Sequence, residues 1–368
     1  MTSIPMFDLT AVTDVNELSK IAQRVISSKH HILGQAVETF EKSFADYVGV
    51  NYCLGVANGT DAIEIALIAA GVEKDDLVAT VANAGFYTST SINKIGAKPL
   101  YIDINEDDLL MNVIDLKEKI SKNKIRAVVM THLFGLVANV KEIFEICKKN
   151  KIILIEDCAQ AHGAQISGQK VGSFGDLASF SFYPTKNLGA VGDAGAITTN
   201  SIEFASNIKA IRQYGWTSKY SVEFKLGSNS RLDEIQAAFL TYKLEKLDIW
   251  NQSRIDIAKK YVEGFKGSKV KTLKNVETGV AHLFVVKTES RNDLIKYLES
   301  KHINSAIHYP IPDHQQTISI SEFEKISLPV TEAMSDKILS LPIYPGMPIE
   351  NVERVISSVK EFIESASK

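Results

Sequence analysis

The chain has 368 residues, a formal net charge of −3 and 45% hydrophobic residues. This length allows two domains and a sizeable core. The slightly acidic balance argues against a nucleic-acid partner, because nucleic-acid binders are usually basic. Neither a long apolar span nor a signal peptide is visible, so we expect a cytoplasmic protein without a membrane partner. The three cysteines, Cys53, Cys147 and Cys158, are too scattered for a disulfide framework or a zinc site, and we expect no bound metal.

Short apolar runs alternate with amphipathic segments through the first two thirds of the chain. Apolar residues at helical spacing predict helices at 34–50, from about 59 to 71, and at 143–150. Apolar or β-branched runs predict buried strands at 77–82, 126–131, 152–156 and 178–182. This alternation is typical of an α/β domain in which helices cover a mainly parallel sheet.

The pattern changes after about residue 247. A charged helix at 253–265, a strand near 282–286 and helices at 291–300 and 351–366 indicate a smaller α+β domain. We therefore predict a large domain at 1–247, which includes the N-terminal segment, and a small domain at 248–368. Just before this boundary a helix is predicted at 232–244, with Ile235, Ala238 and Phe239 facing the core.

The first candidate site is the turn Asn58-Gly59-Thr60, which lies between a strand end and a helix. Free backbone amides at the start of that helix form an anion site, to which the hydroxyls of Thr60 and Ser181 can add hydrogen bonds. Taken alone, the same three residues are an ordinary capped turn.

The second candidate site combines Lys186 with Asp157. Lys186 follows the strand at 178–182 in the run SFYPTKNLG (181–189), and Asp157 ends the strand at 152–156. A lysine held out of bulk water can form a Schiff base, because its neutral amine is easier to reach. A buried carboxylate can keep a pyridine nitrogen protonated, so the pair indicates pyridoxal phosphate as the cofactor, with Gln160 close to its phenolic oxygen or ring. Taken singly, a lysine at a strand end is more often a surface charge, and Asp157 is as readily a helix cap or turn residue.

Four runs in this order resemble one family: NGTDA (58–62), EDCAQAHGA (156–164), SFYPTKNLG (181–189) and GSNSRLDEIQAA (227–238). The chain is similar to the nucleotide-sugar aminotransferases of the DegT/DnrJ/StrS group, which are pyridoxal phosphate enzymes of fold type I. The likeness extends from IPMFDL (4–9) to LPIYPG (341–346). It implies an aspartate-aminotransferase-like large domain with a mainly parallel seven-stranded sheet, followed by a smaller α+β domain.

The resemblance also implies roles for individual residues. Lys186 becomes the lysine that binds the cofactor covalently, Asp157 the partner of the ring nitrogen, and Gln160 the neighbour of the cofactor oxygen. The remaining cofactor contacts are the phosphate ligands Gly59, Thr60 and Ser181, the ring-stacking Phe86, and Asn229, which the partner subunit contributes. Arg231 would then lie near the substrate, and the protein would be a homodimer with shared active sites.

The implied reaction moves an amino group from L-glutamate to a nucleotide-linked keto-sugar, with Lys186 as the base. The run YPTKNLGAVGDAGA (183–196) resembles the branch that converts dTDP-3-keto-6-deoxyhexose to dTDP-3-amino-3,6-dideoxyhexose. In that branch Tyr183, His308 and Tyr309 surround the hexose, although His308 taken alone is as readily a core or loop histidine. Many 4-keto enzymes carry Gly-Glu-Gly-Gly where this chain has GDAG (192–195).

Three alternatives stay open on sequence alone. One is a 4-keto aminotransferase that acts on a dTDP- or UDP-linked sugar. The second is a non-catalytic regulator that keeps the fold, against which the presence of Lys186 and Asp157 counts. The third is a dinucleotide-dependent dehydrogenase, but no Gly-x-Gly-x-x-Gly run follows an N-terminal strand.

Overall fold

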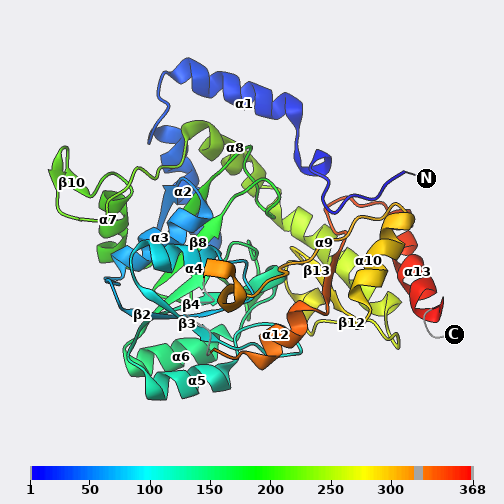
Figure 1. Cartoon of the computed structure of the whole chain (residues 1–368). Helices are drawn as coiled ribbons and strands as arrows, with labels where there is room; N and C mark the ends of the chain where they lie inside the picture. The colour runs from blue at the N-terminus through cyan, green and yellow to red at the C-terminus, as the bar shows by residue number, and fades with distance from the viewer. Residues whose placement is uncertain (1, 319–325, 366–368) are drawn as a thin grey trace.

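The computed structural model describes residues 2–318 and 326–365, and it contains a seven-stranded sheet at the centre of the larger part (Figure 1). The strands follow the order β1-β9-β8-β5-β4-β2-β3, and all pairs are parallel except those that β9 makes with β1 and β8. This confirms the mainly parallel sheet. The strands are β1 (Tyr52–Val56), β2 (Leu77–Val81), β3 (Lys98–Ile102), β4 (Ile125–Thr131), β5 (Ile153–Asp157), β8 (Leu177–Ser181) and β9 (Gly195–Thr199).

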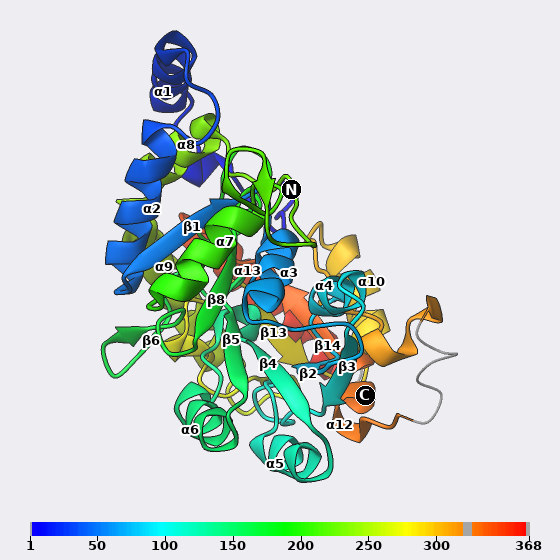
Figure 2. The same cartoon turned by 90° about the vertical axis from the view of Figure 1, so that its left-hand side faces the viewer.

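Helices cover both faces of this sheet, as expected when neighbouring strand residues point to opposite sides. Val129 and Ile155 belong to the apolar cluster that includes α3 (Gly59–Ala69), α4 (Tyr87–Lys94) and α7 (Ile202–Ile211). Their neighbours Val128 and Leu154 pack instead with α5 (Val113–Lys122) and α6 (Val140–Asn150). Figure 2 shows the strands side by side with α3, α4 and α7 on the near face. The first long helix, α2 (Gln35–Val48), covers the other face near β1 and β8 together with α8 (Glu234–Leu244).

The C-terminal part contains an antiparallel sheet of β12 (Lys271–Thr272), β13 (Phe284–Lys287) and β14 (Ile338–Leu341). Its helices are α9 (Leu247–Gly264), α10 (Arg291–Ser300), α12 (Pro329–Ser335) and α13 (Ile349–Ser365). The predicted helices and strand of this region are therefore confirmed, and residue 366 lies outside the described residues. Two short hairpins lie outside these sheets, β6–β7 (Gln165–Ile166, Gln169–Lys170) and β10–β11 (Trp216–Ser218, Ser221–Val222).

The predicted division at 247/248 coincides with the start of α9, but one apolar core extends across it. Tyr261 of α9 and Phe284 of β13 belong to the same apolar cluster as Val128 of β4. The N-terminal segment also crosses the division, because Ile4 pairs with Ile303 next to α10. The exact boundary stays a prediction.

One helix face differs from the sequence prediction. Ile235, Ala238 and Phe239 of α8 pack against α1 (Val15–Ser28), whereas the core contacts come from Ala237 and Leu240. Helical spacing indicates that this helix has apolar residues on two sides. It does not determine which side packs against the sheet. In Figure 1, α1 lies beside α8 at the top of the molecule, away from the sheet.

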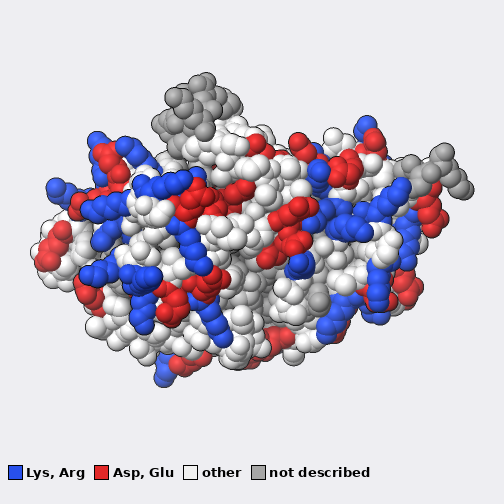
Figure 3. All heavy atoms as spheres, turned by 90° about the horizontal axis from the view of Figure 1, so that it is seen from below, with Lys and Arg blue, Asp and Glu red and all other residues white. Residues whose placement is uncertain are grey.

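Charged side chains are mixed on the face seen in Figure 3, where lysines and arginines alternate with aspartates and glutamates. This distribution agrees with the small net charge of −3. In the ranges 2–318 and 326–365, no helix combines the length and the apolar character needed to cross a membrane.

Candidate active site

A cavity of about 570 Å³ lies at the carboxyl ends of the central strands, where ligands bind in open α/β sheets. Four parts of the chain form it: the start of α3, the end of β5, the loop after β8, and a segment from the C-terminal part. Nine of the predicted site residues line this cavity: Gly59, Thr60, Asp157, Gln160, Ser181, Tyr183, Lys186, His308 and Tyr309. Three of the four runs that carry the family resemblance, 58–62, 156–164 and 181–189, therefore meet at this cavity.

One end of the cavity is the N-terminus of α3, which has the properties of a phosphate site. The side chain of Asn58 caps the helix, because its Oδ1 accepts from the Asp61 amide at 2.8 Å. The amides of Gly59 and Thr60 precede the first intrahelical hydrogen bond and are available to an anion. A Cβ atom on Gly59 would lie 2.5 Å from Cβ of Ser181, so the helix and the strand end are in direct contact only because residue 59 is glycine.

Asp157 is the last residue of β5, and its carboxylate is buried at the cavity wall. Oδ1 accepts from the Ala159 amide at 3.1 Å, and Oδ2 accepts from Oγ1 of Thr131 at 3.3 Å. Burial raises the pKa of Asp157, while the Ala159 amide and the charge of Lys186 act in the opposite direction. No ion pair to this carboxylate occurs among the described residues. A cationic ring nitrogen would supply the missing charge, so the residues fit pyridoxal phosphate.

Lys186 projects into the same cavity from a tight turn after β8, in which its backbone amide donates to the Tyr183 carbonyl at 2.8 Å. Burial lowers the pKa of Lys186 to about 8, against the attraction of Asp157. The neutral amine is therefore populated close to physiological pH, which is the condition for a nucleophile and a base.

Helix α8 holds the loop that follows Lys186. The side chain of Gln236 makes two hydrogen bonds to the backbone of Val191. Its Oε1 accepts from the Val191 amide at 2.8 Å, and its Nε2 donates to the Val191 carbonyl at 3.0 Å. The buried Lys243 donates to the Gly189 carbonyl at 2.8 Å. The loop position thus depends on a helix that comes some 50 residues later in the chain.

Gln160, His308 and Tyr309 form a second wall. Oε1 of Gln160 accepts from the Phe134 amide at 2.6 Å, and its Nε2 donates to the Tyr309 hydroxyl at 3.2 Å. The hydroxyl of Tyr309 also takes part in a side-chain hydrogen bond with Tyr87, another residue of the cavity lining. Nδ1 of His308 lies 2.9 Å from Oγ of Ser340, and burial lowers the pKa of His308 to about 4.

Three predicted residues do not line this cavity: Phe86, Asn229 and Arg231. Phe86 precedes α4 and donates its amide to Asp313, while the next residue, Tyr87, reaches the cavity. Asn229 is exposed and pairs with Gln213, and Arg231 lies over the ring of Tyr214 at 5.9 Å. The roles assigned to these three residues stay predictions.

Among the lining residues that were not singled out from the sequence, five have aromatic or polar side chains: Phe7, Tyr87, Thr185, Asp193 and His282. Phe7 belongs to the N-terminal run that supported the family resemblance, which was the available signal for it. His282 lies just before β13, a strand that was predicted only from its apolar residues. Its contribution depends on a contact between the two parts of the chain.

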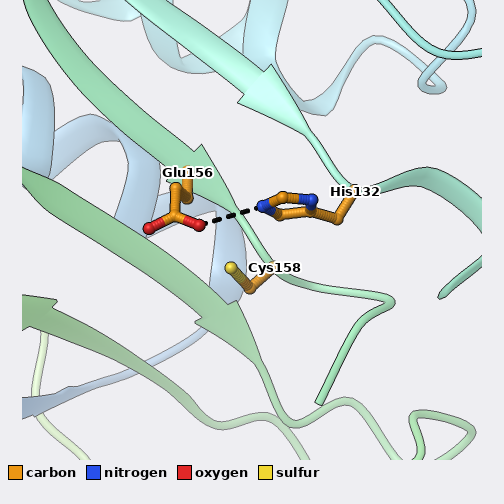
Figure 4. A group of neighbouring side chains, drawn as sticks. All are labelled: His132, Glu156 and Cys158. Atoms are coloured by element: carbon orange, nitrogen blue, oxygen red, sulfur yellow. Dashed lines mark hydrogen bonds and ion pairs between the residues drawn. The ribbon is translucent and has the colours of Figure 1, made fainter. Parts of the chain in front are cut away.

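A compact group of His132, Glu156 and Cys158 lies around the end of β5 (Figure 4), and its potential ligand atoms are within 4.8 Å of one another. Both oxygens of Glu156 already accept backbone amides from the loop at 172–175. Nδ1 of His132 accepts from the Ala138 amide, so its Nε2 carries the hydrogen that is donated to Glu156 at 3.0 Å. Burial raises the pKa of Cys158 well above its ordinary value. The potential ligand atoms of Glu156 and His132 are thus already used in hydrogen bonds, and these bonds anchor the end of β5.

Comparison with known proteins gives a consistent result. The sequence pattern of the DegT/DnrJ/EryC1/StrS aminotransferase family matches residues 13–360. A dTDP-3-amino-3,4,6-trideoxy-alpha-D-glucose transaminase of Micromonospora megalomicea is 40% identical and covers 93% of both chains. A dTDP-3-amino-3,6-dideoxy-alpha-D-galactopyranose transaminase of Aneurinibacillus thermoaerophilus is 41% identical, over 98% of this chain and 99% of the relative. The crystal structure of S. venezuelae DesV in complex with a ketimine intermediate superposes with a TM-score of 0.95 over 99% of both chains, at 35% identity.

Proposed function

Because this chain belongs to the DegT/DnrJ/EryC1/StrS aminotransferase family, we propose that it transfers the amino group of L-glutamate to C3 of a dTDP-linked 3-keto-6-deoxyhexose. The product would be a dTDP-3-amino-3,6-dideoxyhexose. The two relatives that are about 40% identical over nearly the whole chain support the C3 position and the dTDP group, since both are named as dTDP-3-amino sugar transaminases.

Pyridoxal 5′-phosphate would be held at its two ends. The amides of Gly59 and Thr60 and the hydroxyls of Thr60 and Ser181 would bind the phosphate. Asp157 would pair with the ring nitrogen, Gln160 with the ring or its oxygen, and Phe86 with the ring face. When bound, this cofactor supplies an electron sink for bond breaking next to the amino-bearing carbon.

The protein side chains would control the proton and the position of the sugar. Nζ of Lys186 would take a proton from the reacting carbon and return it, for which a pKa of about 8 suits an amine working near neutral pH. Tyr183, His308 and Tyr309 would contact the hexose. The neutral state of His308, whose pKa burial lowers, supports a hydrogen-bonding role rather than binding of an anion.

We also propose a homodimer with shared active sites, to which each subunit contributes Asn229 and Arg231 across the interface. The exposure of Asn229 and the absence of both residues from the lining of their own cavity support this arrangement.

The observation that carries the proposal is the meeting of Lys186, Asp157 and the start of α3 in one cavity. The test is incubation of the purified protein with pyridoxal phosphate, L-glutamate and a panel of dTDP- and UDP-linked 3-keto and 4-keto sugars. Mass spectrometry should detect an amino sugar from the dTDP-linked 3-keto substrates. Preferred turnover of a 4-keto sugar would overturn the C3 assignment, and no turnover of any sugar would overturn the function.

A further inference from the structure

His282 lies in the cavity wall with Lys186 and His308. It is 3% exposed and is held on two sides. The ring of Phe7 stacks against it, with ring centroids 6.5 Å apart and an angle of 28° between the planes. One ring nitrogen, Nδ1, lies 2.9 Å from Oδ1 of Asn187, the residue that follows Lys186.

The hydrogen bonds around Asn187 determine which nitrogen of His282 carries its hydrogen. Nδ2 of Asn187 donates to Oδ1 of Asn251 at 2.8 Å and to the Val280 carbonyl at 3.0 Å, which uses both amide hydrogens. Asn251 is oriented in turn, because its own Nδ2 donates to the His162 carbonyl at 2.8 Å. Rotating either amide by 180° would set oxygen against oxygen. Oδ1 of Asn187 can only accept, so Nδ1 of His282 must donate to it.

The second ring nitrogen, Nε2, is therefore an unprotonated acceptor. It has no hydrogen-bond partner among residues 2–318 and 326–365. Burial lowers the pKa of His282 well below its ordinary value, and the neighbouring charges of Lys186 and Arg254 and the rings of His162 and His308 act in the same direction. Protonation at Nε2 is thus disfavoured, and the nitrogen remains an acceptor when a ligand enters.

Because Nε2 of His282 can only accept a hydrogen bond, only a ligand group that donates one can bind to it. Nε2 cannot bond a carbonyl, a carboxylate or a phosphate oxygen, because each of these also only accepts. This excludes the side-chain carboxylate of the amino donor and the pyrophosphate of the sugar nucleotide. A hexose hydroxyl does carry a suitable hydrogen.

We propose that His282 is a specificity-determining residue whose Nε2 accepts a hydrogen bond from a ring hydroxyl of the hexose. This proposal rests on the proposed function, since it takes the substrate to be a nucleotide-linked sugar. A site built around a buried acceptor discriminates strongly against a ligand that lacks the matching donor, because the acceptor is then desolvated and unpaired.

The matched variants are His282→Asn and His282→Gln. The amide nitrogen of asparagine lies close to the position of Nδ1, so His282→Asn keeps the bond to Asn187 and places nothing at Nε2. Glutamine is longer, and its terminal amide reaches the position of Nε2, so His282→Gln restores a possible acceptor there. The two half-reactions are followed separately by cofactor absorbance. Binding of a dTDP-6-deoxyhexose without a keto group, and of dTDP alone, is measured by calorimetry.

We expect His282→Asn to leave the glutamate half-reaction within about twofold of wild type and to raise KM for the keto-sugar by about 10- to 100-fold. His282→Gln should recover part of this loss. Affinity for the dTDP-hexose should fall by a similar factor, and affinity for dTDP alone should not change. A test on the wild-type protein avoids any folding defect of a variant. Its kcat/KM should fall by a comparable factor with one of two keto-sugar analogues, which lack the hydroxyl at C2 or at C4.

Two results would overturn the proposal. One is an equal loss in both half-reactions of His282→Asn, which would assign His282 to holding Lys186 through Asn187. The other is a wild-type protein that handles both deoxy analogues as well as the parent sugar. Failure of the wild-type protein to aminate any nucleotide sugar is a separate outcome, which refutes the proposed function together with this proposal.

Discussion

Lys186 and Asp157 share one cavity, and burial moves the pKa of each toward the neutral form: the lysine pKa falls to about 8 and the aspartate pKa rises. Their mutual attraction opposes both shifts. In the cofactor-free protein the lysine is therefore a reactive amine near neutral pH. Asp157 is a carboxylate whose charge a cationic ring nitrogen would stabilise.

The first prediction concerns the pH dependence of Lys186. Because its folded pKa of about 8 lies below the ordinary 10.5, the neutral amine should predominate above about pH 8. In cofactor-free protein, the labelling rate of Lys186 by trinitrobenzenesulfonate, read by peptide mass spectrometry, should rise about tenfold per pH unit below pH 8 and then level off. In urea-unfolded protein it should keep rising to about pH 10. A rise that continues to the same pH in the folded protein would contradict the shift.

The second prediction concerns Asp157→Asn. The amide can keep the hydrogen bond from Ala159, so the fold should persist with an unchanged thermal midpoint. A neutral side chain cannot hold the ring nitrogen protonated, and kcat should fall by about 10²- to 10³-fold. The measurement is steady-state transamination of L-glutamate with the keto-sugar. Normal kinetics in the folded variant would refute the role of Asp157.

At the scale of elements, the site depends on contacts between helices and the ends of strands. The start of α3 lies against the end of β8 through Gly59 and Ser181, and the backbone of Gly195 on β9 closes against Asn58. Helix α8 then fixes the loop after Lys186 through Gln236 and Lys243. These contacts set the distance between the phosphate site and the amine.

The third prediction is that Gly59→Ala weakens cofactor binding. The added Cβ would lie 2.5 Å from Cβ of Ser181, so α3 must move away from the strand end. Such overpacking costs roughly 1–3 kcal/mol, and we expect a loss of at least about tenfold in affinity for pyridoxal phosphate. Equilibrium dialysis with pyridoxal, which has no phosphate, is the control and should show a smaller loss. Equal losses for both ligands would contradict a phosphate site at this helix.

At the scale of the whole molecule, the segment with β10, β11 and Asn229 lies on the outside. Figure 1 shows β10 projecting beside α7, and Tyr220 of this hairpin is 75% exposed. The apolar and aromatic residues of the hairpin have little cover in the single chain. A second subunit that receives Asn229 and Arg231 would account for their distance from their own cavity.

The fourth prediction is complementation between inactive subunits. Lys186→Ala subunits are mixed with subunits that carry Asn229→Asp and Arg231→Ala. If the site is shared, each heterodimer has one site with all the lesions and one with none, so it should recover up to half the activity of a wild-type dimer. Transamination is assayed after subunit exchange has been confirmed by a tagged pull-down. Exchange without recovered activity would mean that each site is self-contained.

The sequence by itself determined the helices and strands, and those site residues whose place depends on their neighbours in the chain. Strand ends can be read from apolar runs, so Asp157 and Lys186 were correctly expected near the carboxyl edge of a sheet. The turn at Gly59 was recognisable because glycine and a helix start follow a strand directly. Each of these features arises from residues that are neighbours in the chain, where spacing and backbone preference carry the information.

Only the tertiary structure decided which distant groups share the site and which face each helix presents. The hydrogen bond from His282 to Asn187 joins residues 95 positions apart, and no local pattern reports it. Likewise, Ile235, Ala238 and Phe239 satisfy helical spacing but pack on α1, because Ala237 and Leu240 face the sheet. The physical reason is the same in both cases: a buried polar or apolar side chain is stabilised by whichever partner packing brings to it, and that partner comes from another part of the chain.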